Sequence, residues 1–204
     1  AAAVPGAHFV ELPGTDHAPW FEEPELILTM VEEFVTGERH RADPDRVLAT
    51  TLFTDIVDST TQASRMGDRR WKEILDQYDS LVARHLDRLS GRLVKTTGDG
   101  TLATFDGPAR AIRCACAIRD DAKRLGLEMR AGLHAGEIEI RGNDVTGLAV
   151  VIAQRVCALA GSNEVLVSST VKDLVVGSGI ELVSRGSHAL KGVPEVWTLF
   201  AVTC

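Results

Sequence analysis

The sequence predicts an α+β fold, in which helices cover a central, mostly antiparallel sheet. Three observations support this class. The predicted elements follow the order strand, helix, hairpin, helix, strand, helix, strand. A Gly-Asp-Gly turn at 98–100 lies between two β-prone runs, which indicates a hairpin. The segment 68–91 carries the apolar stripe of a long amphipathic helix.

Glycine and proline residues set the expected boundaries of these elements. Gly67 and Gly91 each end a helix, Asp68 is expected to cap the long helix, and Pro108 suits a first helical turn. The order expected is strand 47–57, helix 59–66, helix 68–91, strands 92–97 and 101–105, helix 108–124, strand 127–140, helix 148–160, strand 164–168, helix 169–176 and two final strands.

The first 46 residues are expected to be separate from this domain. A β-prone run at 8–12 predicts a strand, and 24–36 predicts a helix with apolar residues on one face. The charged segment 37–46 contains a proline and is expected to be a linker. The domains predicted are therefore a leader, 1–36, and a main domain, 47–204.

Composition limits the classes of function. A chain of 204 residues, 45% of them hydrophobic, can bury one core plus an appendage. A net charge of −7 argues against sequence-independent nucleic-acid binding. The longest apolar run, 148–153, is far shorter than the roughly 18 residues of a membrane helix, and no secretory signal is expected. The four cysteines lack C-x-x-C spacing, which predicts reduced thiols and a cytoplasmic location.

Two aspartates at structural breaks are candidate metal ligands. Asp99 lies at the tip of the predicted hairpin between two glycines, where it either completes the turn or binds a hard cation such as Mg²⁺. Asp55 lies within an apolar strand, where a carboxylate is costly unless it is paired, hydrogen-bonded or bound to metal.

The strand-to-helix junction after Asp55 is a candidate phosphate site. Backbone N–H groups of Val57, Asp58, Ser59 and Thr60 are expected to be free there, and a helix N-terminus favours anions. Asp58 is interpreted as the helix cap rather than a ligand.

Six short segments follow one another along the main domain: FTDI at 53–56, KTTGDG at 95–100, GLHAGE at 132–137, DVTG at 144–147, AQR at 153–155 and LKGV at 190–193. In this order they resemble the motifs of the class III nucleotidyl cyclases, the adenylyl and guanylyl cyclase family. The similarity extends from about 49 to 202, and several motifs in order are more specific than one.

The resemblance implies a ferredoxin-like domain of the polymerase-palm type that cyclises ATP to 3′,5′-cyclic AMP and pyrophosphate. It implies two Mg²⁺ or Mn²⁺ ions per site, with the metal site formed by Asp55, Ile56 and Asp99. It makes Arg155 the transition-state arginine, although an exposed helix residue is the simpler interpretation of Arg155 alone. It also implies a homodimer with shared active sites.

The same resemblance assigns purine recognition to Lys95 and Asp144. In adenylyl cyclases the matching lysine donates to ring N1 and the carboxylate accepts from the 6-amino group, whereas guanine presents the reversed pattern. Separately, each residue could be solvated. Together they favour ATP as the substrate. His134, by contrast, is expected to be a packed histidine, and Lys191 a surface lysine that could approach the triphosphate.

One position departs from the family pattern. Family members usually carry a ribose-orienting asparagine seven residues after the base-reading aspartate, and here that position is Val151. A slow enzyme is expected, because losing one positioning group costs on the order of 100-fold in rate. The alternative is a cyclase-like regulatory or dimerisation module that binds nucleotide without turning it over.

The leader resembles the last strand, catalytic-histidine loop and last helix of α/β hydrolases, with His17 at the general-base position. No G-x-S-x-G elbow precedes it, so no acyl-enzyme is expected. The leader is interpreted as the end of a hydrolase domain fused to the cyclase, with His17 idle.

Overall fold

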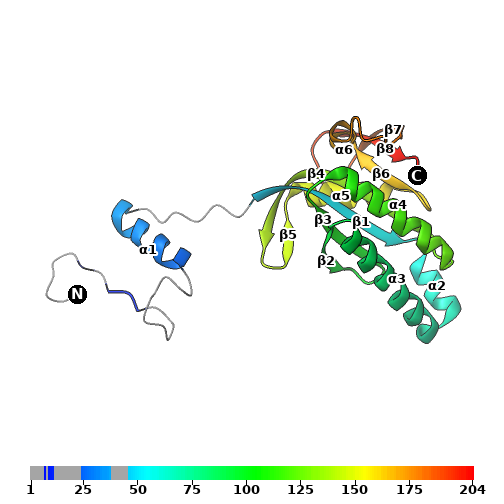
Figure 1. The fold of residues 1–204 in the computed structure, drawn as a ribbon, viewed down its shortest axis with the longest axis horizontal. Helices are drawn as coiled ribbons and strands as arrows, with labels where there is room; N and C mark the ends of the chain where they lie inside the picture. Colours follow the sequence, from blue (N-terminus) through cyan, green and yellow to red (C-terminus); the bar gives the residue numbers. More distant parts are fainter. Residues whose placement is uncertain (1–6, 8, 12–23, 38–45) are drawn as a thin grey trace. The chain divides into compact units, whose positions relative to one another are not determined.

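The structure is a computed structural model that describes residues 7, 9–11, 24–37 and 46–204 (Figure 1). The elements in chain order are α1 (Pro24–Thr36), β1 (Arg46–Ile56), α2 (Ser59–Met66), α3 (Asp68–Arg88), β2 (Arg92–Thr96), β3 (Gly100–Phe105), α4 (Pro108–Arg124), β4 (Met129–Arg141), β5 (Asp144–Thr146), α5 (Leu148–Leu159), β6 (Val165–Ser168), α6 (Ser169–Leu174), β7 (Leu182–Ala189) and β8 (Val196–Val202).

The chain divides into two compact units, 1–43 and 44–204. In the first unit, α1 has the predicted bounds. Residues 9–11, part of the predicted strand 8–12, are not in a strand. A strand needs a hydrogen-bonded partner, and the part of the first unit that the structure describes contains no other strand. His17 lies outside the described residues.

The second unit is an α+β domain, as predicted, and it is built on one eight-stranded sheet. Its strand order is β2-β3-β1-β4-β6-β8-β7, with β5 paired to β4. Only the β4–β6 pair is parallel, so the sheet is mostly antiparallel. The central strand β1 pairs with β3 on one side and β4 on the other, which places its residues in the middle of the domain.

Helices cover both faces of this sheet. Leu52 and Ile56 of β1 pack into the main core with α3 and α4, and the Tyr78 hydroxyl of α3 donates to Thr54 Oγ1 at 3.1 Å. Alternate residues of a strand point to opposite faces of the sheet. Helix α5 packs against β4 and β1 on the face opposite α3 and α4. A Cβ on Gly132 of β4 would lie 2.0 Å from the backbone nitrogen of Cys157, so α5 can approach the sheet this closely only over glycine.

The helix predictions agree with the structure in position and differ at the caps. Gly67, with φ of 78°, ends α2 and also occupies the N-cap of α3, so Asp68 is the first residue of α3 rather than its cap. An acidic residue is still favourable there, because the helix N-terminus carries partial positive charge. The short strand β5 was not predicted. Figure 1 shows β5 and α2 at opposite ends of the domain.

The cysteines differ from the expectation of reduced thiols. Cys116 of α4 and Cys204 form a disulfide, with Cα atoms 5.9 Å apart, although 88 residues separate them in sequence. Cys114 and Cys157 are free, and burial raises the pKa of both thiols to about 12. None of the described helices is long and apolar enough to cross a membrane.

Candidate active site

Asp55 lies near the end of β1 and is paired with an arginine on the next strand. The register places Asp55 opposite Gly100 of β3 and opposite Arg130 of β4. Arg130 donates from Nε at 2.8 Å and from Nη2 at 2.5 Å, both to Asp55 Oδ2. The Asp55 side chain is 30% exposed, so the pair is open to solvent on one side.

Arg130 was not identified as a site residue from the sequence. It is 75 residues from Asp55, and only the register of β1 against β4 brings the two together. The signal that could have found it is the general requirement that a carboxylate in an apolar strand has a partner on a neighbouring strand.

Asp99 lies at the tip of the β2–β3 hairpin and contacts the start of α2. The hairpin closes with a hydrogen bond from Thr97 N to Gly100 O at 2.8 Å, and the Ser59 hydroxyl donates to Asp99 Oδ2. A Cβ on Gly100 would lie 2.6 Å from the carbonyl oxygen of Thr54, so glycine is required at this point. Since Asp55 lies opposite Gly100, the two aspartates are brought to the same end of adjacent strands.

The junction between β1 and α2 differs from the expected phosphate site in two respects. Val57 N–H donates to Glu128 O at 2.8 Å, so it is not available to an anion. Asp58 occupies the N-cap position with a left-handed φ of 53°, but its side chain makes no capping hydrogen bond. Ser59 and Thr60 lie in the first turn of α2, where backbone N–H groups lack acceptors within the helix.

Lys95 and Asp144 form an ion pair between β2 and β5. Lys95 Nζ donates to Asp144 Oδ2 at 2.6 Å, and Val145 N–H donates to Asp144 Oδ1 at 2.8 Å. The hydrogen bond from Lys95, and then that from Val145, hold the pKa of the Asp144 carboxyl below its ordinary value. Each side chain is about half exposed, at 48% and 46%, so a ligand can reach both groups.

Arg155 and Val151 lie one turn apart on the same side of α5. Arg155 Nε donates to the carbonyl oxygen of Lys191 at 3.1 Å, which ties α5 to the segment before β8. Val151 is half-buried and offers no polar side-chain atom. The position that the family resemblance assigns to ribose orientation therefore offers no hydrogen bond.

The oxygen donors of Asp55 and Asp99 fit the chemistry of a hard cation. Among the described residues, no group of three or more His, Cys, Asp or Glu side chains could hold a metal. Asp55 and Asp99 supply carboxylate oxygens, the ligands that Mg²⁺ prefers together with water and substrate phosphates. The Ile56 side chain is buried and apolar, so only its carbonyl oxygen could serve as a ligand.

His134 does not belong to this group. Its Nδ1 lies 2.7 Å from Ser168 Oγ, and its ring packs edge-on against Trp197 with centroids 5.3 Å apart. Burial lowers the pKa of His134 to about 4, so the ring is neutral near pH 7. His134 is a packed histidine, as the sequence predicted.

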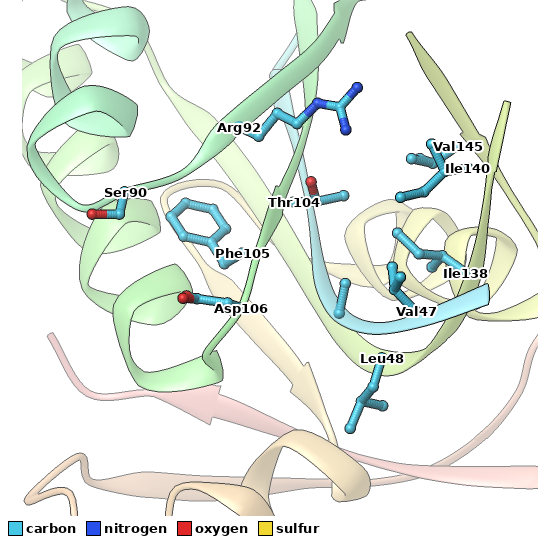
Figure 2. A pocket seen from close by; sticks show the side chains of 11 residues that line it. Val47, Leu48, Ser90, Arg92, Thr104, Phe105, Asp106, Ile138, Ile140 and Val145 are labelled. Carbon is cyan, nitrogen blue, oxygen red and sulfur yellow. The ribbon is translucent and has the colours of Figure 1, made fainter. Parts of the chain in front are cut away.

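A pocket of about 380 Å³ lies near the opposite end of β1 from Asp55 (Figure 2). Its walls are mostly apolar, with Val47, Ile138 and Val145 around it and Arg92 at one side. None of the predicted site residues lines it. The candidate site is therefore the exposed surface around the two aspartates and the Lys95–Asp144 pair, rather than this pocket.

Comparison with known proteins identifies the domain. Residues 45–203 match the Adenylate and Guanylate cyclase catalytic domain family, and the chain belongs to that family. It is 33% identical over 141 residues to "Putative adenylate cyclase 3" of Rhizobium meliloti, which covers 63% of this chain and 23% of that protein. It is 29% identical over 134 residues to an adenylate cyclase of Streptomyces coelicolor, covering 65% of this chain and 35% of that protein. The chain thus spans about a quarter to a third of the length of these relatives.

Solved structures share the fold. The adenylyl cyclase CyaB from P. aeruginosa superposes with a TM-score of 0.74 at 20% identity, covering 79% of this chain and 96% of that one. An adenylate/guanylate cyclase/hydrolase from Silicibacter pomeroyi gives a TM-score of 0.72 at 23% identity, covering 79% and 99%. The family match begins at residue 45, so it does not include the leader, and the likeness of residues 1–36 to the end of an α/β hydrolase stays a prediction.

Proposed function

We propose that this nucleotidyl cyclase domain is an adenylyl cyclase that converts ATP to 3′,5′-cyclic AMP and pyrophosphate. The observation that carries the proposal is the contact between Lys95 Nζ and Asp144 Oδ2 at 2.6 Å, on a surface that a purine can reach. It places one donor and one acceptor side by side, as adenine requires.

Adenine presents a ring N1 acceptor next to a 6-amino donor. Lys95 donates to the first and Asp144 accepts from the second. Guanine presents an N1–H donor next to an O6 acceptor, so each protein group would face a group of its own kind. An unpaired polar group in a binding site costs about 1–3 kcal/mol, which is enough to discriminate between the two bases.

In the reaction, the ribose 3′-oxygen attacks the α-phosphorus, the bond from that phosphorus to the bridging oxygen breaks, and pyrophosphate leaves. The 3′-hydroxyl proton is lost as the new ester forms. Asp55 and Asp99 would hold Mg²⁺ or Mn²⁺, which would neutralise charge on the phosphates and lower the pKa of the 3′-hydroxyl. Arg155 presents a planar guanidinium to the α-phosphate, where charge builds in the transition state.

The arrangement of these residues supports a homodimer with shared active sites. Asp99 contacts Ser59 of α2, whereas Asp144 lies on β5, and α2 and β5 are at opposite ends of the domain (Figure 1). Lys95 and Asp99 are only four residues apart on one hairpin, with a rise of about 3.3 Å per strand residue. One hairpin would therefore have difficulty placing Lys95 on the purine and Asp99 on the triphosphate metals of the same ATP. One ATP is therefore bound by the carboxylates of one protomer and the base-reading pair and Arg155 of its partner.

A second candidate function is a regulatory or dimerisation module that binds nucleotide without cyclising it. Val151 favours this alternative, because its side chain cannot hydrogen-bond a ribose. The joint presence of Asp55, Asp99 and Arg155 favours the enzyme, since binding alone has no evident need for all three.

Product analysis separates the two. Purified protein is incubated with ATP and Mn²⁺, and cyclic AMP and pyrophosphate are quantified by chromatography, with GTP in a parallel reaction. We expect equimolar cyclic AMP and pyrophosphate from ATP and much less cyclic GMP. Nucleotide binding without either product would favour the regulatory module, and a preference for GTP would contradict the assignment of Lys95 and Asp144.

A further inference from the structure

One oxygen of the Asp55 carboxylate is paired with a cation of the protein itself, the guanidinium of Arg130. Both hydrogen bonds from Arg130, at 2.8 and 2.5 Å, go to the same oxygen, Asp55 Oδ2. The pairing follows directly from the sheet, because β1 and β4 place the two residues opposite each other. Asp99, by contrast, accepts a hydrogen bond from the neutral hydroxyl of Ser59.

A divalent ion that binds Asp55 would lie close to the Arg130 guanidinium, and the two positive charges would repel each other. Like charges about 4 Å apart repel even in water, and more strongly near a protein surface. The Arg130 side chain is 35% exposed, so it can turn toward solvent without disturbing the packed core.

We infer that Arg130 is an internal competitor of the metal at Asp55, which weakens metal binding to the nucleotide-free protein. The inference rests on the proposed function, in which Asp55 is a metal ligand. A nucleoside triphosphate brings enough negative charge to hold both the metal and the displaced guanidinium. Metal therefore binds Asp55 mainly together with nucleotide. Arg130 is a positioning residue that makes metal binding depend on the nucleotide.

The test measures Mn²⁺ binding to the nucleotide-free protein by calorimetry and by electron paramagnetic resonance. Arg130→Gln removes the charge and keeps a hydrogen-bond donor, and it is expected to bind Mn²⁺ up to about fivefold more tightly than the parent, the upper end of the range for losing one partly exposed ion pair. Arg130→Lys keeps the charge without the two parallel hydrogen bonds. Its Mn²⁺ affinity should lie between those of the parent and Arg130→Gln. Adding Asp55→Asn to Arg130→Gln should remove the gain.

Arg185→Gln is the matched control. Arg185 of β7 donates to Glu164 Oε1 at 2.7 Å, so its loss frees one carboxylate oxygen and changes the net charge equally. Arg185 lies three strands along the sheet from β4. Its Mn²⁺ affinity should equal that of the parent. Circular dichroism and thermal melting verify that each variant is folded. If Arg130→Gln does not fold, Arg130→Lys serves as the test variant.

The outcomes separate this inference from the proposed function. If folded Arg130→Gln binds Mn²⁺ no more tightly than the parent, or no binding is measurable in either, the competition is wrong even where cyclic AMP is produced. If the affinity rises and depends on Asp55 while no cyclic nucleotide forms, the competition stands and the proposed catalysis fails.

Discussion

Lys95 and Asp144 are 49 residues apart in sequence and form a 2.6 Å ion pair in the fold. Lys95 belongs to the β2–β3 hairpin, and Asp144 begins β5, which returns along the end of β4. Neither residue is informative alone, because single exposed lysines and aspartates are common. Their contact gives the site a donor and an acceptor at a fixed spacing.

The first prediction concerns the titration of Asp144. Since the hydrogen bond from Lys95 is the largest cause of its lowered pKa, Lys95→Ala should raise the pKa of Asp144 toward the ordinary value of about 3.9. The remaining bond from Val145 N–H should keep it somewhat below that value. Carboxyl-carbon NMR titration of parent and variant measures both.

The sign of this shift sets the pH window of the ion pair. A lowered pKa in the folded state means that the pair stabilises the protein above the unfolded-state pKa and that this contribution is lost as pH falls through the folded-state pKa. The preference for ATP over GTP should therefore be constant between pH 6 and about pH 8. An Asp144 pKa unchanged by Lys95→Ala would mean that the pair does not persist in solution.

The second prediction concerns base selection. Lys95→Glu combined with Asp144→Cys presents an acceptor and a small group in place of the donor and the carboxylate, and should shift preference from ATP toward GTP. Each single variant should mainly reduce ATP use, because it leaves one group unmatched. kcat/KM for both nucleotides is measured. A double variant as selective for ATP as the parent would show that other residues read the purine.

The third prediction concerns the two aspartates. Asp55→Ala and Asp99→Ala should each reduce cyclisation by more than about 100-fold, because each removes a ligand of the catalytic ions. Both side chains are partly exposed, so melting temperatures should change little. Asp58→Asn is the control, since the Asp58 side chain makes no capping hydrogen bond and asparagine tolerates the left-handed φ of 53°. Near-normal activity of either variant at saturating Mn²⁺ would remove the two-metal proposal.

Sequence patterns predicted the features that depend on local structure. The bounds of α1, α2 and α4 agree with the helix predictions, because caps, glycines and apolar periodicity are local signals. The hairpin that carries Asp99 was predicted for the same reason.

The features that sequence reasoning missed depend on the register between strands or on contacts between distant segments. Arg130 meets Asp55 only because β1 and β4 pair in one register. The carbonyl oxygen of Glu128, just before β4, accepts a hydrogen bond from Val57 N–H, just after β1, for the same reason. The Cys116–Cys204 disulfide joins residues 88 apart. Periodicity along one segment contains no information on which residue of another segment lies opposite.

The fourth prediction concerns Val151. If the missing amide limits the reaction, Val151→Asn should raise kcat by up to about 100-fold with little change in KM, since ribose orientation matters most in the transition state. Val151→Ala is the control for side-chain size and should not raise kcat. The position is half-buried at the start of α5, so thermal melting verifies that asparagine is tolerated. A lower or unchanged kcat in the folded variant would mean that another group orients the ribose.

The last prediction concerns shared active sites. Asp55→Ala and Arg155→Ala chains should each be inactive alone, because each removes one half of every site. In a mixed dimer, one site carries both defects and the other carries neither, provided that the carboxylates and Arg155 come from different protomers. Random pairing makes about half of the dimers mixed, and each has one of two sites intact, so mixing should restore up to about a quarter of parental activity.

The control pairs two defects expected in the same protomer's half of the site. Asp55→Ala mixed with Asp99→Ala leaves both sites of a mixed dimer with one damaged carboxylate each, so no activity should return. Subunit exchange is verified with differently tagged chains recovered together by affinity purification. Inactivity of the Asp55→Ala and Arg155→Ala mixture, in samples that exchange subunits, would place all of the catalytic residues within one chain. The separation of α2 from β5 would then require a closure within the protomer that brings Asp144 toward Asp99.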